Sequence, residues 1–291
     1  MKKENLGDKA INFFSLGLVT TFSLLCIFPF FYVIAYSLTS YSDYLMNPAR
    51  LIPPKITFAA YKQLLDFPLI SSGYKVTLFI TVVGTILSVF LLLISAYPLA
   101  KKDLKGRNTI LALITFTMFF NGGLIPNYYL IRNLHLLNTV WALILPGLLS
   151  VFNLLVMKSF ISNIPNSLEE SAIIDGANEI VILFKIILPL SLPVIATFSV
   201  FSAVGYWNSF FNAIIYTTKR SLWPLMLVLR ELVVEDGASQ VSQVMTDPNN
   251  VSNPFTLKMA AIIITTVPIL LVYPFAQKYF TKGVLLGSVK G

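Results

Sequence analysis

Six long stretches of this chain contain no Asp, Glu, Lys or Arg, and they restrict the possible folds more than any other feature. The stretches are Ile11–Ser42, Val76–Ala100, Asn108–Ile131, Asn133–Met157, Ile186–Thr218 and Met259–Gln277. Each can cross a hydrocarbon core of about 30 Å as a helix, which takes about 20 residues. A lipid-exposed backbone must satisfy its own hydrogen bonds, and a helix does so within one segment. We therefore expect an all-α, polytopic membrane protein with six transmembrane helices.

Composition agrees with a chain that lies largely in lipid. Of the 291 residues, 56% are hydrophobic and only 12% are charged. A soluble fold of this length could not bury so much apolar surface. The net charge of +8 requires no nucleic-acid partner, because basic residues beside membrane helices contact anionic lipid. We expect membrane lipid as a partner and no nucleic acid.

The clusters of basic residues predict the orientation. Lys2, Lys3 and Lys9 precede the first stretch, and Lys101–Arg107 holds four positive charges. The positive-inside rule places both in the cytoplasm, and six spans return the C-terminus to the same side. No cleavage site follows the N-terminal charges, so we expect a retained first helix. The expected spans, in one domain over 1–291, are about 14–38, 76–99, 109–131, 138–158, 189–214 and 259–279, with a cytoplasmic loop at 160–188 and outer loops at 40–75 and 216–258.

The second outer loop contains a short apolar segment, Leu222–Leu229. It is too short to span a bilayer, so we expect a helix that lies at the outer surface or dips into the mouth of the protein. Two roles are open for it: contact with a partner outside the membrane, or bracing of the fifth and sixth spans.

Several kinds of site are missing from the sequence. The helix interiors hold none of the ionisable residues that secondary transporters and pumps use as relays. There is no GxxxxGK[ST] phosphate-binding loop, no HExxH, no GxSxG and no cysteine–histidine cluster, and Cys26 is the single cysteine. We expect a chain that is not an enzyme, has no catalytic or metal site and binds no cofactor itself. If it drives transport, the energy comes from another subunit.

The inner loop contains a conspicuous polar segment, EESAIIDGANEIVILFKIILPLSLP at residues 169–193. Ser167 and Glu170 have the spacing of a capping box, which predicts a helix over 168–174. Asp175-Gly176 then breaks the helix, with Gly176 free to adopt a positive φ. Asn178 starts a second helix with a regular apolar face. The loop therefore predicts a bent helical element at the inner membrane face.

Charge distinguishes this element from a helix that merely lies on lipid. It presents the carboxylates of Glu169, Glu170, Asp175 and Glu179 but only one basic residue, Lys185. Interfacial helices favour Lys and Arg on the polar face, because they bind anionic lipid. The acidic surface therefore suits a basic protein partner better than a membrane.

The same residues carry a resemblance to a known family. Glu170-Ser171-Ala172-x-x-Asp175-Gly176-Ala177, followed by Leu188-Pro189-Leu190, resembles the EAA motif of ABC-importer permeases, with Ser171 in place of the usual alanine. In that family the motif is the coupling helix that docks on a cytoplasmic ATPase. The resemblance implies seven coupling residues: Glu169, Glu170, Ser171, Ala172, Asp175, Gly176 and Ala177.

Further motifs resemble one branch of the maltose-type carbohydrate permeases, in particular the second permease subunit. They are Gly122-Gly123-Leu124-Ile125-Pro126, Tyr206-Trp207-Asn208 and the ending Gly283–Gly291. The branch implies a bacterial cell-membrane permease that forms half of the pathway for an oligosaccharide. The implied partners are a homologous second permease, two copies of an ABC ATPase that bind ATP and Mg, and an extracellular solute-binding protein. The family's C-terminal tail reaches toward the ATPases, which implies contacts at Gly287, Ser288 and Lys290.

Sugar recognition uses aromatic faces and amides in a cavity between helices. Eight residues near the ends of the third and fifth stretches supply both, and we expect them along the substrate pathway: Asn121, Asn127, Tyr128, Tyr129, Trp207, Asn208, Phe211 and Asn212. Two alternatives remain open. One is an ABC permease for a non-sugar solute, and the other is a secondary transporter or channel acting alone.

Overall fold

The computed structural model describes residues 6–48, 50, 52–234 and 254–288, and within these ranges the chain is helical and contains no strand. This confirms the all-α fold class. The helices are α1 (Leu6–Ser37), α2 (Tyr41–Met46), α3 (Ala59–Asp66), α4 (Pro68–Ala100), α5 (Arg107–Phe119), α6 (Leu124–Asn133), α7 (Trp141–Ile144), η1 (Leu145–Gly147), α8 (Val151–Ser162), α9 (Asn166–Ile174), α10 (Glu179–Ile182), η2 (Leu183–Ile187), α11 (Leu188–Leu190), α12 (Leu192–Trp207), α13 (Phe211–Tyr216), η3 (Arg220–Leu222), α14 (Leu225–Val234) and α16 (Pro254–Ser288).

The chain forms two compact units. Unit 1 comprises Met1–Phe67 and Leu229–Val267. Its aromatic cluster joins α1, α2 and α16, because Phe255 stacks on Tyr44 with ring centroids 4.9 Å apart and meets the edge of Tyr36 at 5.6 Å. The Ser37 hydroxyl lies 2.6 Å from the Tyr61 hydroxyl of α3, which ties the short surface helix to the end of α1.

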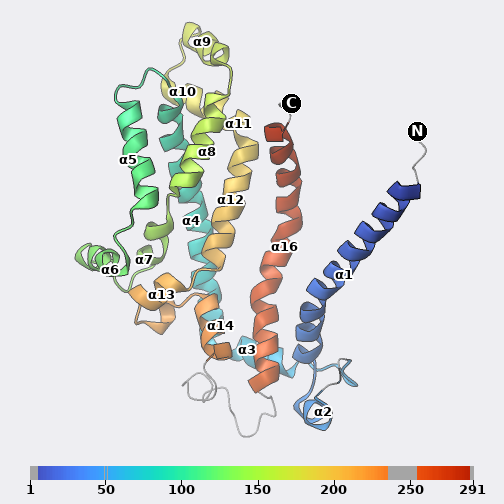
Figure 1. The fold of residues 1–291 in the computed structure, drawn as a ribbon. Coiled ribbons are helices and arrows are strands. Elements are labelled where there is room, and N and C mark those ends of the chain that lie inside the picture. The colour runs from blue at the N-terminus through green and yellow to red at the C-terminus, as the bar shows by residue number, and fades with distance from the viewer. Residues whose placement is uncertain (1–5, 49, 51, 235–253, 289–291) are drawn as a thin grey trace. The chain divides into compact units, whose positions relative to one another are not determined.

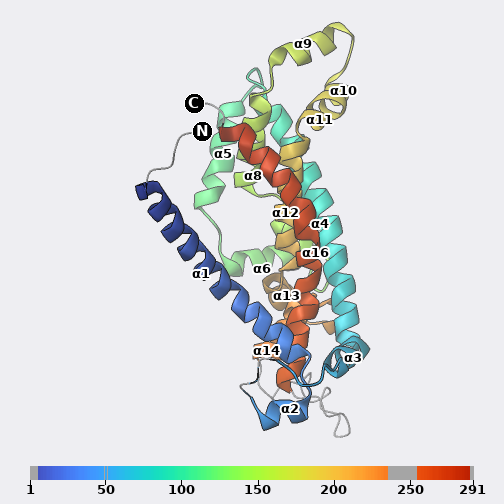
Figure 2. The same ribbon diagram turned by 90° about the vertical axis from the view of Figure 1, so that its right-hand side faces the viewer.

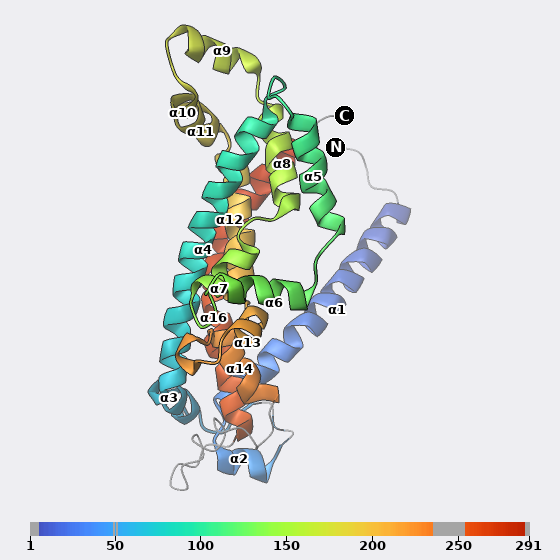
Figure 3. The ribbon, with the colours of Figure 1, turned by 90° about the vertical axis from the view of Figure 1, so that its left-hand side faces the viewer.

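Unit 2 comprises Pro68–Val228 and Pro268–Gly291, and it holds the candidate sites. Its centre is α4, which packs along both α12 and α8 (Figures 1 and 3). Near one end of α4 a cluster of buried apolar residues joins these helices to α10 and η2: Leu92, Leu93, Ala96, Tyr97, Leu99, Leu154, Met157, Ile161, Ile182, Leu183, Ile187 and Phe198. At that end lie α9, α10 and α11 (Figure 2).

The helices provide enough apolar length for a multi-pass membrane protein. Ile11–Ser37, Pro68–Ala100 and Phe255–Val272 can each cross a membrane unbroken. Three further segments are helix pairs with a bend, so the described residues contain three candidate spans, or up to six if each bent pair counts as one. These six segments overlap the six charge-free stretches of the sequence.

The bent pairs differ from the regular helices expected over 109–131, 138–158 and 189–214. In the first pair, α5 ends at Phe119 and α6 begins at Leu124 with its axis turned by 116°. The break has a local cause: Gly123 adopts a φ of 86°, and the Asn121 side chain accepts a hydrogen bond from its N–H at 2.9 Å. Figure 3 shows α6 lying across the direction of α4.

The other two bent pairs turn at polar residues. Trp141–Gly147 and Val151–Ser162 meet at 53°, where the Ser150 side chain caps α8. Glu179–Leu190 and Leu192–Trp207 meet at 79° around Ser191. The helix expected to begin at Pro189 thus begins at Leu192, with a proline, Pro193, in its first turn. It ends at Trp207 and not at 214, and α13 follows as a separate helix.

Candidate coupling element and membrane pocket

The first leg of the coupling element is α9. The predicted capping box is wrong, because α9 starts at Asn166 after Pro165, and no side chain caps it. Pro165 has a ψ of 127°, outside the helical range, so the chain enters the helix directly after this residue. Ser167 therefore lies inside the first turn, and its carbonyl accepts a hydrogen bond from the Ser171 hydroxyl at 2.8 Å.

The end of α9 is a Schellman motif. Gly176 has a φ of 82°, as the sequence predicted. The Gly176 N–H donates to the Ile173 carbonyl at 3.0 Å, and the Ala177 N–H donates to the Ala172 carbonyl at 2.9 Å. Ala172 and Ala177 also pack against the buried apolar cluster of unit 2. The spacing Ala-x-x-x-Gly-Ala thus has a structural reason: two small residues meet the core on either side of a left-handed turn.

The second leg starts where the sequence predicted. The Asn178 side chain caps α10 by accepting a hydrogen bond from the Val181 N–H at 2.9 Å. The helix then continues through the π-helical turn η2 into α11. Ile182 and Ile187 of this leg have no exposed surface, which confirms the predicted apolar face and anchors the leg to α4 and α8.

The predicted coupling residues divide into an outward and an inward set. Glu170, Ser171 and Asp175 are exposed. Beside them Ile173 and Ile174 are 54% and 85% exposed, and adjacent exposed apolar side chains with a polar rim are typical of an interaction site. Together they give α9 an apolar and acidic outer surface, which has the composition of a docking site. The side chains of Glu169, Ala172 and Ala177 are half-buried against unit 2.

Glu169 lies close to Lys101, the residue directly after α4. The Lys101 ammonium is 3.6 Å from the Glu169 carboxylate and donates a hydrogen bond to Glu179. Partial burial alone would lower the pKa of Lys101, but the hydrogen bonds with Glu179 and Tyr97 raise this pKa above its ordinary value. Lys101 therefore stays protonated beside the coupling element. Sequence reasoning missed this contact, because KKDLKGR was interpreted only as a signal for membrane orientation.

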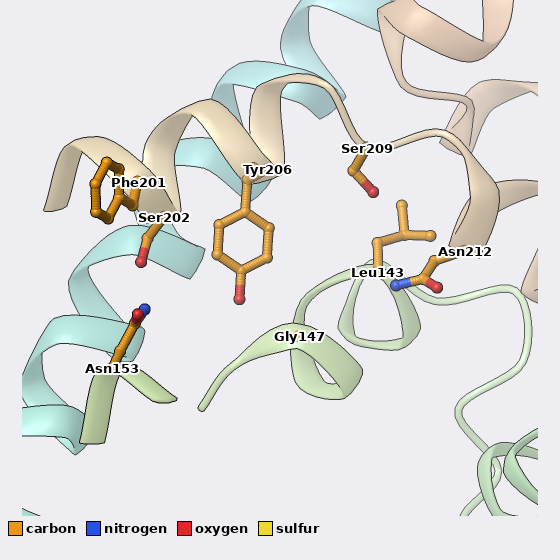
Figure 4. Close-up of a pocket in the computed structure, with 9 residues that line it drawn as sticks. Leu143, Gly147, Asn153, Phe201, Ser202, Tyr206, Ser209 and Asn212 are labelled. Carbon is orange, nitrogen blue, oxygen red and sulfur yellow. The ribbon is translucent and has the colours of Figure 1, made fainter. Parts of the chain in front are cut away.

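A pocket with a volume of about 310 Å³ opens along α12 in the same unit (Figure 4). Its polar residues come from three helices: Asn153 of α8, Ser202 and Tyr206 of α12, and Asn212 of α13, with Ser209 in the turn between the last two. Asn153 and Ser202 point toward one another in Figure 4. The pocket thus combines an aromatic ring with hydroxyl and amide groups.

Tyr206 is fixed in place from three directions. Its hydroxyl lies 3.1 Å from the Ile144 carbonyl, to which it donates, and 3.3 Å from the Ser88 hydroxyl of α4. Gly84 of α4 lies under the ring, where a Cβ atom would be 2.6 Å from a ring carbon. A glycine is required here because α4 and α12 approach so closely.

The eight predicted pathway residues do not share one pocket. Asn212 lines the pocket of Tyr206. Trp207 faces Tyr74 of α4, with ring centroids 6.4 Å apart, in a separate apolar pocket. Tyr128 and Tyr129 line a third pocket together with Ile214. The remaining four, Asn121, Asn127, Asn208 and Phe211, are exposed.

Asn153, Ser202, Tyr206 and Ser209 were missed as pocket residues. A signal was present, since Ser202, Tyr206 and Ser209 have the i, i+4, i+7 spacing of one helix face. Of the three residues predicted to contact the ATPases at the C-terminus, Gly287 and Ser288 are the last two residues of α16. Lys290 lies outside the described residues. The predicted outer loop 216–258 is described at 216–234 and 254–258. Its short apolar helix is α14, which begins at Leu225 and not at Leu222 as predicted.

Known proteins with this fold and sequence identify the class. A family model described as "binding-protein-dependent transport system inner membrane component" matches residues 1–286. The polygalacturonan/rhamnogalacturonan transport system permease protein YtcP of Bacillus subtilis (strain 168) is 45% identical over 277 residues, 94% of this chain and 96% of that protein. Protein LplC of the same strain is 46% identical over 265 residues, 91% of this chain and 90% of LplC. A permease chain of a bacterial ABC transporter that imports the acidic polysaccharide alginate matches with a TM-score of 0.90 and 29% identity, covering 96% of this chain and 100% of that chain.

The all-helical fold and these relatives together identify a transport permease. The chain belongs to the family of binding-protein-dependent transport system inner membrane components. It is a multi-pass membrane protein and a permease of an ABC importer. Family membership removes the alternative of a secondary transporter or channel acting alone.

Proposed function

We propose that this chain forms half of the membrane pathway for an oligosaccharide, paired with a second, homologous permease. Two ATPase subunits bind ATP and Mg, and one of them docks on α9 of this chain. An extracellular binding protein delivers the sugar. The N- and C-termini lie in the cytoplasm of a bacterial cell. The chain itself binds no cofactor and catalyses no reaction.

The outer surface of α9 is the observation that carries this proposal. It places exposed apolar side chains, such as Ile173 and Ile174, beside the carboxylates of Glu170 and Asp175. Such a surface fits a cleft that has an apolar floor and basic residues at its rim. In Figures 1 and 2 the C-terminal end of α16 points to the same end of unit 2 as α9, which supports a cytoplasmic C-terminus.

The chemistry of the Tyr206 pocket supports a sugar as the solute. Asn153, Ser202, Ser209 and Asn212 offer amide and hydroxyl groups that can donate to or accept from sugar hydroxyls. The ring of Tyr206 offers an apolar face beside them. Among the described residues that line the pocket none is charged, so its polar groups suit neutral hydroxyls. The printed names of YtcP and of the alginate importer also refer to polysaccharides.

In an alternating-access mechanism, the coupling element and the Tyr206 pocket have different roles. Closure of the ATPase dimer moves α9, the first leg of the coupling element, while the second leg is held against α4 and α8 by the buried isoleucines Ile182 and Ile187. The movement changes the packing of α4 against α12, and Tyr206 lies at that interface. The permease thereby exposes the pocket to one side of the membrane at a time.

Uptake by the purified importer tests the proposal. In proteoliposomes that contain both permeases, the ATPases and the binding protein, we expect oligosaccharide uptake that requires ATP and is blocked by vanadate. Glu170→Lys should abolish this uptake while the protein still inserts, because the new charge opposes a basic docking cleft. Uptake of an amino acid or peptide, but no sugar, would instead establish the non-sugar alternative. Unchanged sugar uptake by Glu170→Lys would remove this residue from docking.

A further inference from the structure

One cation connects the end of α4 to both legs of the coupling element. We call Tyr97, Lys101, Glu169 and Glu179 the Lys101 cluster. Lys101 is 3.6 Å from Glu169 of α9 and donates to Glu179, the first residue of α10. Tyr97, one turn earlier on α4, donates its hydroxyl hydrogen to the same Glu179 oxygen at 2.7 Å. The ammonium of Lys101 lies 4.8 Å from the centre of the Tyr97 ring, which adds a cation–π contact.

The cluster spans the bend of the coupling element. Glu169 lies before the left-handed turn at Gly176, and Glu179 lies after it. A single ammonium that holds a carboxylate from each side fixes the angle between the legs relative to the end of α4. The contacts to Glu169 and Glu179 come from a residue about 70 to 80 positions away, so the bend geometry is set by tertiary contacts as well as by the local turn.

Stability alone does not explain the cluster. The Lys101–Glu179 pair contributes little to folding stability, because the Glu179 side chain is 62% exposed and exposed ion pairs are weak. The buried apolar residues Ile182, Leu183 and Ile187 already attach the second leg to α4 and α8. The ion pairs at this position therefore orient the two legs, and the face of α9 that bears Glu170, more than they stabilise the fold.

From the cluster, α4 leads directly to the pocket. About two and a half turns from Tyr97 toward the middle of α4, the Ser88 hydroxyl contacts the hydroxyl of Tyr206. Gly84, about one turn further, lies under the Tyr206 ring. The helix is continuous between Ser88 and Tyr97, since α4 runs from Pro68 to Ala100 and its internal proline, Pro98, comes after Tyr97. A displacement of its end at Lys101 is therefore carried to the pocket by one rigid element.

We propose that Lys101, supported by Tyr97, is a positioning residue that transmits movement of α9 and α10 into α4 and so couples ATP hydrolysis to opening of the pocket. The proposal rests on the proposed function as an ATP-driven permease. Movement of the coupling element can reach α12 directly, because α10 and α11 lead into α12 along the chain. The contacts of Lys101 would carry the same movement into α4 as well.

The test compares Lys101→Met with Lys102→Met in the complete importer. Methionine retains an apolar side chain of similar length but has no charge. Lys102 is the exposed neighbour on the same loop and is the matched control. We expect Lys101→Met to assemble with the ATPases but to import about fivefold less sugar per ATP hydrolysed, a loss within the usual range of coupling between distant sites. Lys102→Met should match the wild type in both sugar import and ATP hydrolysis.

A milder variant and a rescue separate coupling from folding. Glu179→Gln keeps an oxygen that can accept from Tyr97 but removes the charge, and it should lower the same ratio. A triple variant exchanges the two charges of the central ion pair, through Lys101→Glu and Glu179→Lys. Its third change, Glu169→Gln, removes the carboxylate that would repel the new glutamate at position 101. This combination should recover part of the coupling that Lys101→Glu alone loses.

The outcomes distinguish this inference from the proposed function. A wild-type sugar-to-ATP ratio in both Lys101→Met and Glu179→Gln overturns the role of Lys101. An equal loss in Lys102→Met also overturns it, because the effect would then belong to the charge of the loop as a whole. Absence of ATP-dependent uptake in the wild-type importer would instead contradict the proposed function.

Discussion

Two glycines of this permease occupy positions that few other residues can fill. Gly176 has a φ of 82° at the bend of the coupling element, with open space where its Cβ would be. Gly84 has no special backbone angle but lies under the ring of Tyr206, where a Cβ would come within 2.6 Å of a ring carbon. The first glycine is thus required by backbone conformation and the second by packing.

The backbone requirement at Gly176 predicts a graded response. Gly176→Val should weaken the bend by about 1–2 kcal/mol, because a β-branched residue is strained in the left-handed region. Gly176→Asn should cost less, since asparagine adopts this conformation more readily. ATPase activity stimulated by the binding protein, measured in the purified importer, should fall more for valine than for asparagine. Equal activity in the two variants would contradict a conformational role.

The packing requirement at Gly84 predicts a loss of stability. Gly84→Ala forces α4 and Tyr206 apart and should destabilise the protein by about 1–3 kcal/mol, as overpacking of a core does. The added methyl would meet a rigid ring and not the end of a flexible chain. Gly17→Ala in α1, where a Cβ meets nothing within 4 Å, is the control. Thermal unfolding in detergent should show a lower Tm for Gly84→Ala than for Gly17→Ala.

Among the secondary-structure elements, the bent coupling element combines a buried side with an open one. Ile182 of α10 has no exposed surface, whereas Ile180, two residues earlier, is 67% exposed. The alternation follows from the helical spacing, which turns Ile182 toward α4 and α8 and Ile180 away from them. The short helix is therefore held in place mainly by tertiary packing, as expected for helices of this length.

The two isoleucines of α10 offer a matched pair of variants. Ile182→Ala leaves a cavity in the buried cluster and should cost about 2–5 kcal/mol. Ile180→Ala removes an exposed side chain and should change stability by less than about 0.5 kcal/mol. Thermal unfolding of both proteins measures the difference. Similar Tm values for the two variants would show that α10 is not anchored through Ile182.

For the molecule as a whole, transport depends on partners that the chain lacks. The sequence contains no nucleotide-binding motif, and the six apolar stretches contain no Asp, Glu, Lys or Arg. The family to which it belongs depends on a binding protein. We therefore expect the energy source and the other half of the pathway to come from partner subunits.

We expect the purified chain alone to transport nothing. In liposomes without the second permease and the ATPases, no sugar should accumulate above the level of empty liposomes, with or without an ion gradient. A fluorescent or radiolabelled oligosaccharide and the complete importer as a positive control make the comparison quantitative. Uptake by the single protein without ATP would contradict an ABC permease.

The sequence by itself determined the features that depend on neighbouring residues. Long charge-free stretches predicted the apolar helices, Gly176 predicted the left-handed turn, and Asn178 predicted the cap of α10. Each is decided within about one helical turn, where the relevant hydrogen bonds form. The failed prediction at Ser167 also has a local cause. The helix starts directly after Pro165, two residues earlier than predicted, so Ser167 lies within the first turn and cannot cap it.

Only the tertiary structure decided which distant residues meet. Tyr97 and Glu179 are 82 positions apart, and Tyr206 and Ile144 are 62 apart, yet each pair is hydrogen-bonded. The same packing sends Asn212 to one pocket and Trp207 to another, although both belong to the same predicted span. A hydropathy pattern predicts that a segment is a helix but does not specify its neighbours. Those depend on how small residues such as Gly84 let particular helices approach, and that is a property of the packed molecule.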